Sequence, residues 1–376
     1  MGLHKITDPP KSQLSDTEQW HEVIETEIGK RVWCQLMIQD HFGLCFTDSY
    51  NINPNHCLTE LPKNADDHDL EELDMNVPTI TSYMRTLAYI AKLIPRRFDK
   101  LGPLWSRKPL IEQYRDVLLG DHDMRQVLGE IPTFLRRGDM TERTIDKPWL
   151  DLARRSLAIT AAEKIILIHR PFLFLSFQTS HYPHTRSTCV SAATTIVREY
   201  SNIIASNHIA LWEHSTYCVT ASIILCLEVL YPRSGIQSHG PAQNYHDLVK
   251  SARELLAGRR GDIIANRGAR LIDTMLSVGG IPGSASGSGL AFVSGPQQSR
   301  CSTTSQVRLD LQDIVSQFLQ GDMLRMDLLE EEWSDSLATD LRLDIGPLGQ
   351  DFGTWFEGLF GPGQVRPSVY DYLRQP

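Results

Sequence analysis

The sequence predicts an all-α protein: an irregular multi-helix bundle or superhelix, followed by a flexible linker and an acidic tail. Apolar residues recur at helical spacing through residues 1–278, and no stretch alternates apolar and polar residues as a half-buried strand would. The composition then changes abruptly at Gly279. We therefore expect a helical domain at 1–278, a linker at 279–308 and a tail at 309–376.

The helical domain divides into segments at Pro and at polar clusters. The first expected helix covers residues 27–46, and its apolar residues form one broad stripe. Its members are Ile28, Val32, Trp33, Leu36, Met37, Leu44 and Cys45. A second helix begins at Ile80 and should stop at Pro95, and a third opens after Pro148 and runs toward Pro171. Further helices are expected at 189–204, 209–231, 245–256 and 263–276.

Composition excludes several classes of function. The 376 residues carry a formal net charge of −9, and paired arginines such as Arg96-Arg97 do not form the basic face that direct nucleic-acid binding requires. The seven cysteines form no C-x-x-C pair, so we expect neither a structural zinc site nor any other cofactor in this chain. Residues 209–231 contain Glu213, His214 and Glu228, which favours a core helix over a membrane span.

The segment after Gly279 changes character twice. Residues 279–308 are rich in Gly, Ser and Pro and have few bulky apolar side chains, which is typical of a flexible linker. A short helix is expected near 309–319, and beyond it the chain turns acidic. Large apolar residues then recur at helical spacing beside Asp351 and Glu357: Phe352, Trp355, Phe356, Leu359 and Phe360. This stripe predicts either a helix that binds a partner's groove or a tail that packs back on the helical domain.

Two motifs in the helical domain point to a family. Gly2-Leu3-His4 is followed by the helix E-I-G-K-R-V-W-C-Q-L-M-I-Q-D, with Glu27, Lys30-Arg31, Trp33 and Asp40, and by a loop that reaches Leu61-Pro62. Some 130 residues later, His169-Arg170-Pro171-Phe172 precedes Cys189-x-x-Ala-Ala. Both motifs, in this order, resemble the regulatory "middle homology region" of fungal binuclear zinc cluster transcription factors. The resemblance covers roughly residues 1–260, and Cys34 stands where the family has a second Trp.

The resemblance implies a function and a set of partners. It implies an effector-responsive regulatory region that acts on RNA polymerase II transcription in the nucleus, with coactivators or mediator-type proteins, a homodimer partner and a small-molecule effector as partners. Zinc and DNA binding belong to the family's cysteine cluster, which precedes GLH; because Met1 directly precedes GLH here, we expect an N-terminally truncated form. The matching residues, given structural roles only, are Gly2, Leu3, His4, Glu27, Arg31, Trp33, Asp40, Pro62, His169, Arg170, Pro171 and Phe172.

Two alternatives belong to other classes. An all-α ligand-binding or diphosphate-handling enzyme would need a D-D-x-x-D/E metal motif, but Leu70 stands where the third carboxylate is required after Asp66-Asp67. His181 and His184 with Cys189 lack a fourth metal ligand, and His169 lacks a nucleophile or carboxylate fixed near it by the sequence. We therefore predict no catalytic residue. The third reading is a non-functional fragment that results from a misplaced start codon.

Overall fold

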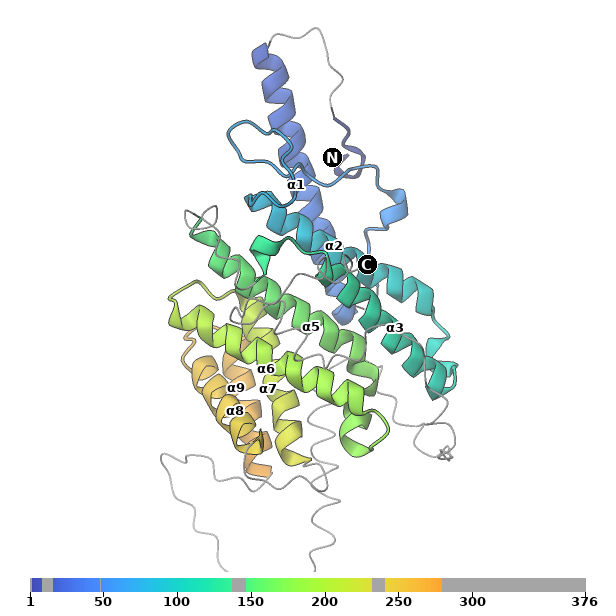
Figure 1. Ribbon diagram of the computed structural model, residues 1–376, viewed down its shortest axis with the longest axis vertical. Helices are drawn as coiled ribbons and strands as arrows, with labels where there is room; N and C mark the ends of the chain where they lie inside the picture. The colour runs from blue at the N-terminus through green and yellow to red at the C-terminus, as the bar shows by residue number, and fades with distance from the viewer. Residues whose placement is uncertain (1, 9–15, 48, 137–146, 232–240, 279–376) are drawn as a thin grey trace, which may run out of the picture. The chain divides into compact units, whose positions relative to one another are not determined.

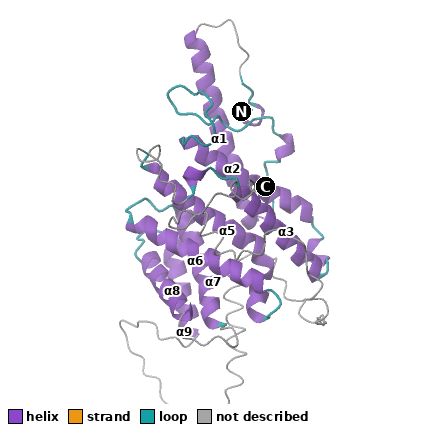
Figure 2. Ribbon diagram, viewed as in Figure 1, coloured by secondary structure: helices purple, strands orange, loops and turns teal. Residues whose placement is uncertain are grey.

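The computed structural model describes residues 2–8, 16–47, 49–136, 147–231 and 241–278 (Figure 1). Within these residues every regular element is helical, as Figure 2 shows, so the all-α prediction is confirmed. The predicted linker at 279–308, the short helix near 309–319 and the acidic tail lie outside the described residues.

The described chain forms two compact units. Unit 1 comprises residues 2–105 and 118–157, and unit 2 comprises residues 106–117 and 158–278. Two helices, α3 (Leu110–Gly129) and α5 (Trp149–Gln178), contribute residues to both units. Each unit is described separately below.

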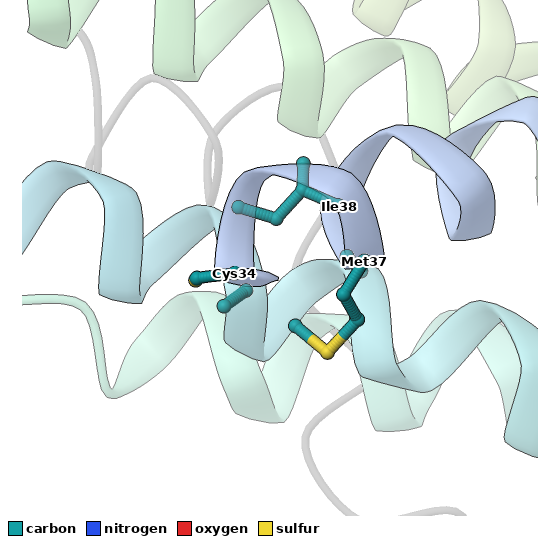
Figure 3. Packing of buried hydrophobic residues seen from close by; sticks show 5 residues of the cluster. Cys34, Met37 and Ile38 are labelled. Atoms are coloured by element: carbon teal, nitrogen blue, oxygen red, sulfur yellow. The ribbon is translucent and has the colours of Figure 1, made fainter. Parts of the chain in front are cut away.

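In unit 1, α1 (Asp16–Thr47) packs along α2 (Ile80–Leu101). Cys34, Met37 and Ile38 of α1 are buried against Ala88 and Ala91 of α2, and Figure 3 shows their side chains. The small alanine side chains let the two helices approach closely while the larger α1 side chains fill the contact.

Four 3-10 turns complete the described elements: η1 (Leu3–Lys5), η2 (Pro54–His56), η3 (Trp105–Arg107) and η4 (Thr133–Leu135).

The predicted broad stripe of α1 is divided between core and surface. Met37 and Leu44 are at most 6% exposed, whereas Ile28, Val32 and Leu36 are 55%, 45% and 42% exposed. The helix also begins at Asp16, earlier than predicted. Apolar spacing identified the helix correctly, but it did not show that two separate faces of α1 are apolar.

The start of α2 is fixed by a capping box and by a buried amide. The Thr79 hydroxyl accepts the Ser82 N–H at 3.1 Å, and the Ser82 hydroxyl accepts the Thr79 N–H at 3.1 Å. The Asn64 amide group donates to the backbone carbonyls of Leu73, Asp74 and Val77, and its oxygen accepts the Thr79 hydroxyl at 2.7 Å. One fully buried Asn side chain therefore joins the loop before α2 to the cap of the helix.

The predicted stop at Pro95 is wrong, because α2 continues to Leu101 and ends before Gly102. Proline inside a helix costs about 3 kcal/mol relative to alanine, since it removes one backbone hydrogen bond and crowds the preceding turn. Both Ile94 and Pro95 are buried. This burial offsets the local penalty, so packing rather than local preference sets the end of the helix.

Unit 2 is built on α5 to α9. The last four helices are α6 (Pro183–Ala205), α7 (Trp212–Leu230), α8 (Pro241–Ala257) and α9 (Ile263–Val278). α7 packs against α6, α8 and α9, and a Cβ added at Gly268 of α9 would lie 2.1 Å from the Val219 side chain of α7. As predicted, 209–231 contains a core helix, and no described helix is long and apolar enough to cross a membrane.

The sequence predicts that Pro171 kinks or ends the third helix, but α5 does not end there. The helix continues to Gln178, and the side chains of Phe172, Phe174 and Phe177 beyond the proline are all at least 95% buried. The reason is the same as at Pro95: the apolar face continues past the proline, and its burial offsets the lost hydrogen bond.

We expect Met37→Ala to destabilise the protein by about 2–5 kcal/mol, because it leaves a cavity between α1 and α2. Val32→Ala, on the exposed face of the same helix, should change the unfolding free energy by no more than roughly 0.5 kcal/mol. Urea unfolding followed by circular dichroism would compare the two variants. Equal losses would contradict the assignment of these residues to different faces.

Candidate functional site

The GLH segment lies on α1 and is held by the loop that precedes α2. The His4 carbonyl accepts the Leu58 N–H at 2.8 Å, and the Leu3 carbonyl accepts the Thr59 hydroxyl at 2.5 Å. The Thr59 hydroxyl oxygen in turn accepts the Ile6 N–H at 2.9 Å. The His4 and Trp33 rings lie 6.1 Å apart. The His4 ring is thus close to Trp33 of α1, while the backbone carbonyls of Leu3 and His4 are bound by the loop.

About one turn of α1 carries a buried carboxylate, Glu27, and a buried ammonium group, Lys30, close to this segment. Glu27 and Lys30 are each 2% exposed, and their charged groups lie 3.3 Å apart. Glu27 also accepts the Lys63 backbone N–H at 2.9 Å, and Lys30 pairs with Asp8 at 2.5 Å. Burial would lower the pKa of Lys30, but its bonds to Asp8 and Glu27 outweigh burial and raise that pKa. Glu27 therefore holds the loop at Lys63 on α1, and Lys30 holds the N-terminal segment at Asp8.

Two arginines make further bonds to the same loop. Arg31 of α1 pairs with Asp67 at 2.6 Å. Arg85 of α2 donates to the Pro62 carbonyl at 2.7 Å and pairs with Glu72 at 3.2 Å. Pro62, which the family motif includes for its position in the chain, is therefore fixed through its carbonyl oxygen.

Asp40 holds the beginning of the loop. Its carboxylate accepts the backbone N–H groups of Asn51, at 2.9 and 3.0 Å, and of Ile52, at 2.7 Å, together with the Asn51 side-chain amide. Burial would raise the pKa of Asp40, but the hydrogen bonds from Ile52 and Asn51 outweigh it and lower the pKa. The neighbouring His41 is fully buried and contacts the Ile52 carbonyl through Nε2 at 2.9 Å.

The residues of the first motif therefore act together as a clasp, which we define as Glu27, Lys30, Arg31 and Asp40. Their charged groups are occupied by backbone N–H groups and by opposite charges of loop residues. Such an arrangement satisfies backbone groups that have no helical partner. It gives structural support to the loop before α2.

The second motif organises the centre of unit 2. His169 is fully buried, and its Nδ1 contacts the Thr185 hydroxyl at 2.9 Å. The Phe172 ring, 1% exposed, lies 5.0 Å from the Tyr114 ring and 4.9 Å from the Tyr182 ring. Burial, together with Tyr114, raises the pKa of Tyr182 to about 12, so Tyr182 stays neutral at physiological pH. His169 and Phe172 join α5 to the start of α6 and the start of α3.

The other two residues of this motif lie between core and solvent. Arg170 and Pro171 are both half-buried on α5.

Sequence reasoning missed an ion pair in unit 2, in which Arg186 of α6 bonds Glu228 of α7 at 2.7 Å and lies over the Phe177 ring. Arg186 also donates to the Tyr231 carbonyl. Arg186 and Glu228 are 42 positions apart, so only the fold reveals the pair.

The acidic residues considered as metal ligands have other partners. Asp67 pairs with Arg31, and Asp66 lies 4.0 Å from Lys147. Leu70, which breaks the metal motif, is 6% exposed and has a left-handed backbone with φ 52°. The diphosphate-handling alternative therefore gains no support.

His181, His184 and Cys189 form the set that the sequence analysis set aside for want of a fourth metal ligand. In the part of the chain that the structure describes, these three residues do not gather as ligands of one ion. The His184 ring lies instead 5.7 Å from that of His169. Cys189 is fully buried in α6.

The outer face of α1 carries an exposed apolar ridge, which we define as Trp20, Ile28, Val32 and Leu36. Trp20 is 38% exposed, and the other three are more exposed. Their spacing in multiples of four follows the i±4 row that packs into the groove of another helix. Val32 and Leu36 thus belong to an apolar surface of unit 1.

Sequence comparisons give relatives of one kind. The chain is 22% identical over 295 residues, 73% of its length, to the Agnestins biosynthesis cluster transcription factor AgnL11 of Paecilomyces divaricatus. It is 21% identical over 68% of its length to "Probable transcription factor lepB" of Aspergillus flavus, and 26% identical over 46% of its length to the Pyrrolocin cluster transcription factor fsdR of a fungal species.

This chain is similar to fungal transcription factors. It spans 41%, 48% and 23% of the length of these three relatives, so it corresponds to less than half of each. No family model and no solved structure matches it. All three relatives are named as transcription factors, which supports a fungal transcription factor family for this chain at low identity. The predicted coactivator contacts, Phe352, Trp355, Phe356, Leu359 and Phe360, lie outside the described residues.

We expect Asp40→Asn to destabilise unit 1 at neutral pH by about 1–2 kcal/mol, because hydrogen bonds to a charged acceptor are replaced by weaker ones. Since the folded pKa of Asp40 is lowered, its ionised form stabilises the fold above its unfolded pKa, and this contribution is lost as the pH falls through the folded value. The difference between wild type and variant should therefore shrink below about pH 4.

Urea unfolding at pH 7, 5 and 3.5 measures this difference. Asp99→Asn is a suitable control, because Asp99 accepts only the Tyr50 hydroxyl, at 2.7 Å, among the described contacts of unit 1. A stability difference for Asp40→Asn that grows as the pH falls would contradict the assigned role.

Proposed function

We propose that this chain is the regulatory, effector-responsive region of a fungal transcription factor that controls RNA polymerase II transcription in the nucleus. The observation that carries the proposal is the similarity to fungal transcription factors, which extends over 73% of the chain in one case and therefore across most of its helical part. The contacts of the motif residues are compatible with the proposal, since Glu27, Lys30 and Asp40 hold chain segments on α1, and His169 and Phe172 join α5 to α6.

The finer assignment to the middle homology region rests on these two motifs. In the first motif, His4 lies near Trp33 of α1; in the second, His169 and Phe172 contact Thr185 and Tyr182 at the start of α6. A regulatory region needs stable helices that present surfaces to partners, and both units offer exposed apolar residues.

Three kinds of partner follow from the proposal. Coactivators or mediator-type proteins would bind the aromatic residues of the tail. A second copy of the chain would cover the apolar ridge of α1, whose i±4 spacing is self-complementary in helix packing. A small-molecule effector would act on the helical units. Zinc is assigned to the family's DNA-binding module, and none is expected in this chain.

We expect no site-selective DNA binding by this chain alone, because its net charge of −9 opposes association with a polyanion. In a mobility-shift titration near physiological salt, any binding should be weak, with a Kd above roughly 1 µM, and should not depend on sequence. Site-selective binding in the nanomolar range would contradict the expectation.

We expect residues 320–376 to activate transcription when fused to a heterologous DNA-binding domain. One face of the expected helix carries Trp355, Phe356, Leu359 and Phe360, and burying each large side chain in a coactivator groove contributes roughly 1.5–3 kcal/mol before the ordering cost. Substituting Trp355→Ala and Phe356→Ala together should reduce reporter output at least tenfold.

The control is the double variant Tyr370→Ala and Tyr372→Ala, which removes two aromatic rings outside the stripe. Its output should match that of the wild-type fusion, with protein levels compared by immunoblot. A silent wild-type fusion, or full output after loss of Trp355 and Phe356, would show that the stripe has no activation role.

A further inference from the structure

One end of unit 2 exposes an unusual number of large apolar side chains. We define the α7–α9 patch as Ile209, Leu211, Trp212, Ile263 and Ile264. They are 79%, 49%, 60%, 66% and 37% exposed, respectively. Ile209 and Leu211 belong to the segment between α6 and α7, Trp212 begins α7, and Ile263 and Ile264 begin α9.

Contacts within unit 2 bring these residues to the same end. Arg259, in the turn between α8 and α9, donates to the Ala210 carbonyl at 2.8 Å. Near the beginnings of the two helices, Gly268 of α9 lies directly against Val219 of α7. The N-terminal ends of α7 and α9 are therefore neighbours, and in Figure 1 the two helices pack together.

The patch is bordered by positive charge. Arg260 lies in the turn before α9, and Arg267 and Arg270 follow Ile263 at four and seven positions, on the same side of α9. All three are exposed, and none forms a salt bridge within the described residues. The nearby Asp262 carboxylate is paired with Arg259 at 3.6 Å. A second carboxylate near the patch is Glu213, in the first turn of α7. Two adjacent helix N-termini add further positive potential.

Such a surface suits an acidic amphipathic segment. Exposed Trp and Arg side chains are the types that dominate binding energy at interfaces, and the arginines select for negative charge. The chain itself contains a matching segment. Residues 351–360 combine Phe352, Trp355 and Phe356 with Asp351 and Glu357, and they follow a strongly acidic stretch.

The connection is long enough for this segment to reach the patch. The chain leaves unit 2 at Val278, the last residue of α9, and must return along that helix, which is about 24 Å long for its 16 residues. Roughly 70 residues separate Val278 from Phe352, and at up to ~3.3 Å per residue a chain of this length can reach much farther than the helix is long. The connection is therefore long enough, and covalent attachment raises the local concentration of the segment.

We propose that residues 351–360 dock on the α7–α9 patch of the same chain, with the aromatic side chains on the apolar residues and the carboxylates beside Arg260, Arg267 and Arg270. The docking does not depend on the proposed function. The proposal makes the α7–α9 patch of unit 2 the binding surface for residues 351–360 of the same chain.

Hydrogen exchange of the 376-residue chain, followed by mass spectrometry, tests the proposal. If the tether gives a local concentration of ~1 mM and the contact a Kd of ~0.1 mM, docking slows exchange about tenfold. Trp355→Ala with Phe356→Ala should accelerate exchange by about that factor in peptides covering 206–212 and 258–264. The Tyr370→Ala, Tyr372→Ala variant should leave these peptides unchanged.

The reciprocal variant, Trp212→Ala with Ile263→Ser, should accelerate exchange in peptides covering 351–360. Both side chains are mostly exposed, so folding should be preserved, and Ile28→Ser on unit 1 provides a control of similar exposure. In 0.5 M NaCl both effects should shrink, because the charge contribution is screened.

Unchanged exchange at the patch after loss of Trp355 and Phe356 would overturn the proposal. So would protection that increases with protein concentration, since that would identify a second copy as the occupant. Reporter activation by the tail with no exchange effect would overturn the docking alone and leave the proposed function intact.

Discussion

Side chains of α1 hold residues 49–79 by hydrogen bonds to backbone groups of Asn51, Ile52 and Lys63, and unit 1 depends on this constraint. Outside the 3-10 turn η2, this segment has no regular hydrogen-bond ladder. Asp40 binds its beginning and Glu27 binds Lys63 near its centre, while Asn64 joins it to the cap of α2. Unsatisfied buried backbone groups are costly, so the charged residues of α1 have a structural reason for their positions.

The clasp also explains how a motif spread over some sixty residues acts as a unit. GLH is held by the loop at Leu58 and Thr59, and the loop is held by Glu27, Arg31 and Asp40 on the helix beneath. A change in any of these contacts can therefore alter the surface that unit 1 presents to a partner. In unit 2, His169 and Phe172 have a comparable role within a fully buried junction.

Helix positions were predictable where apolar spacing was regular, as in α6, α7 and α9. The ends of α2 and α5 were not predictable in this way. Each helix continues past a proline, because burial of Pro95 and of Phe172 outweighs the free-energy cost of proline inside a helix. α3 was missed because charged residues interrupt its apolar pattern. One of them, Asp121, is fully buried beside Arg125 at 2.8 Å. The motif residues are visible in the sequence, but the residues Asn64 and Asp8, which bond the same segments, carry no local sequence signal.

The central claim is that the clasp of α1 holds the 49–79 loop, and hydrogen exchange of Glu27→Gln tests it most directly. Glu27 accepts the Lys63 N–H and pairs with Lys30, so the account predicts faster exchange in peptides covering 57–67. Peptides of α6 and α7 in unit 2 should exchange as in the wild type. Unchanged exchange in the loop, or equal acceleration throughout both units, would contradict the account.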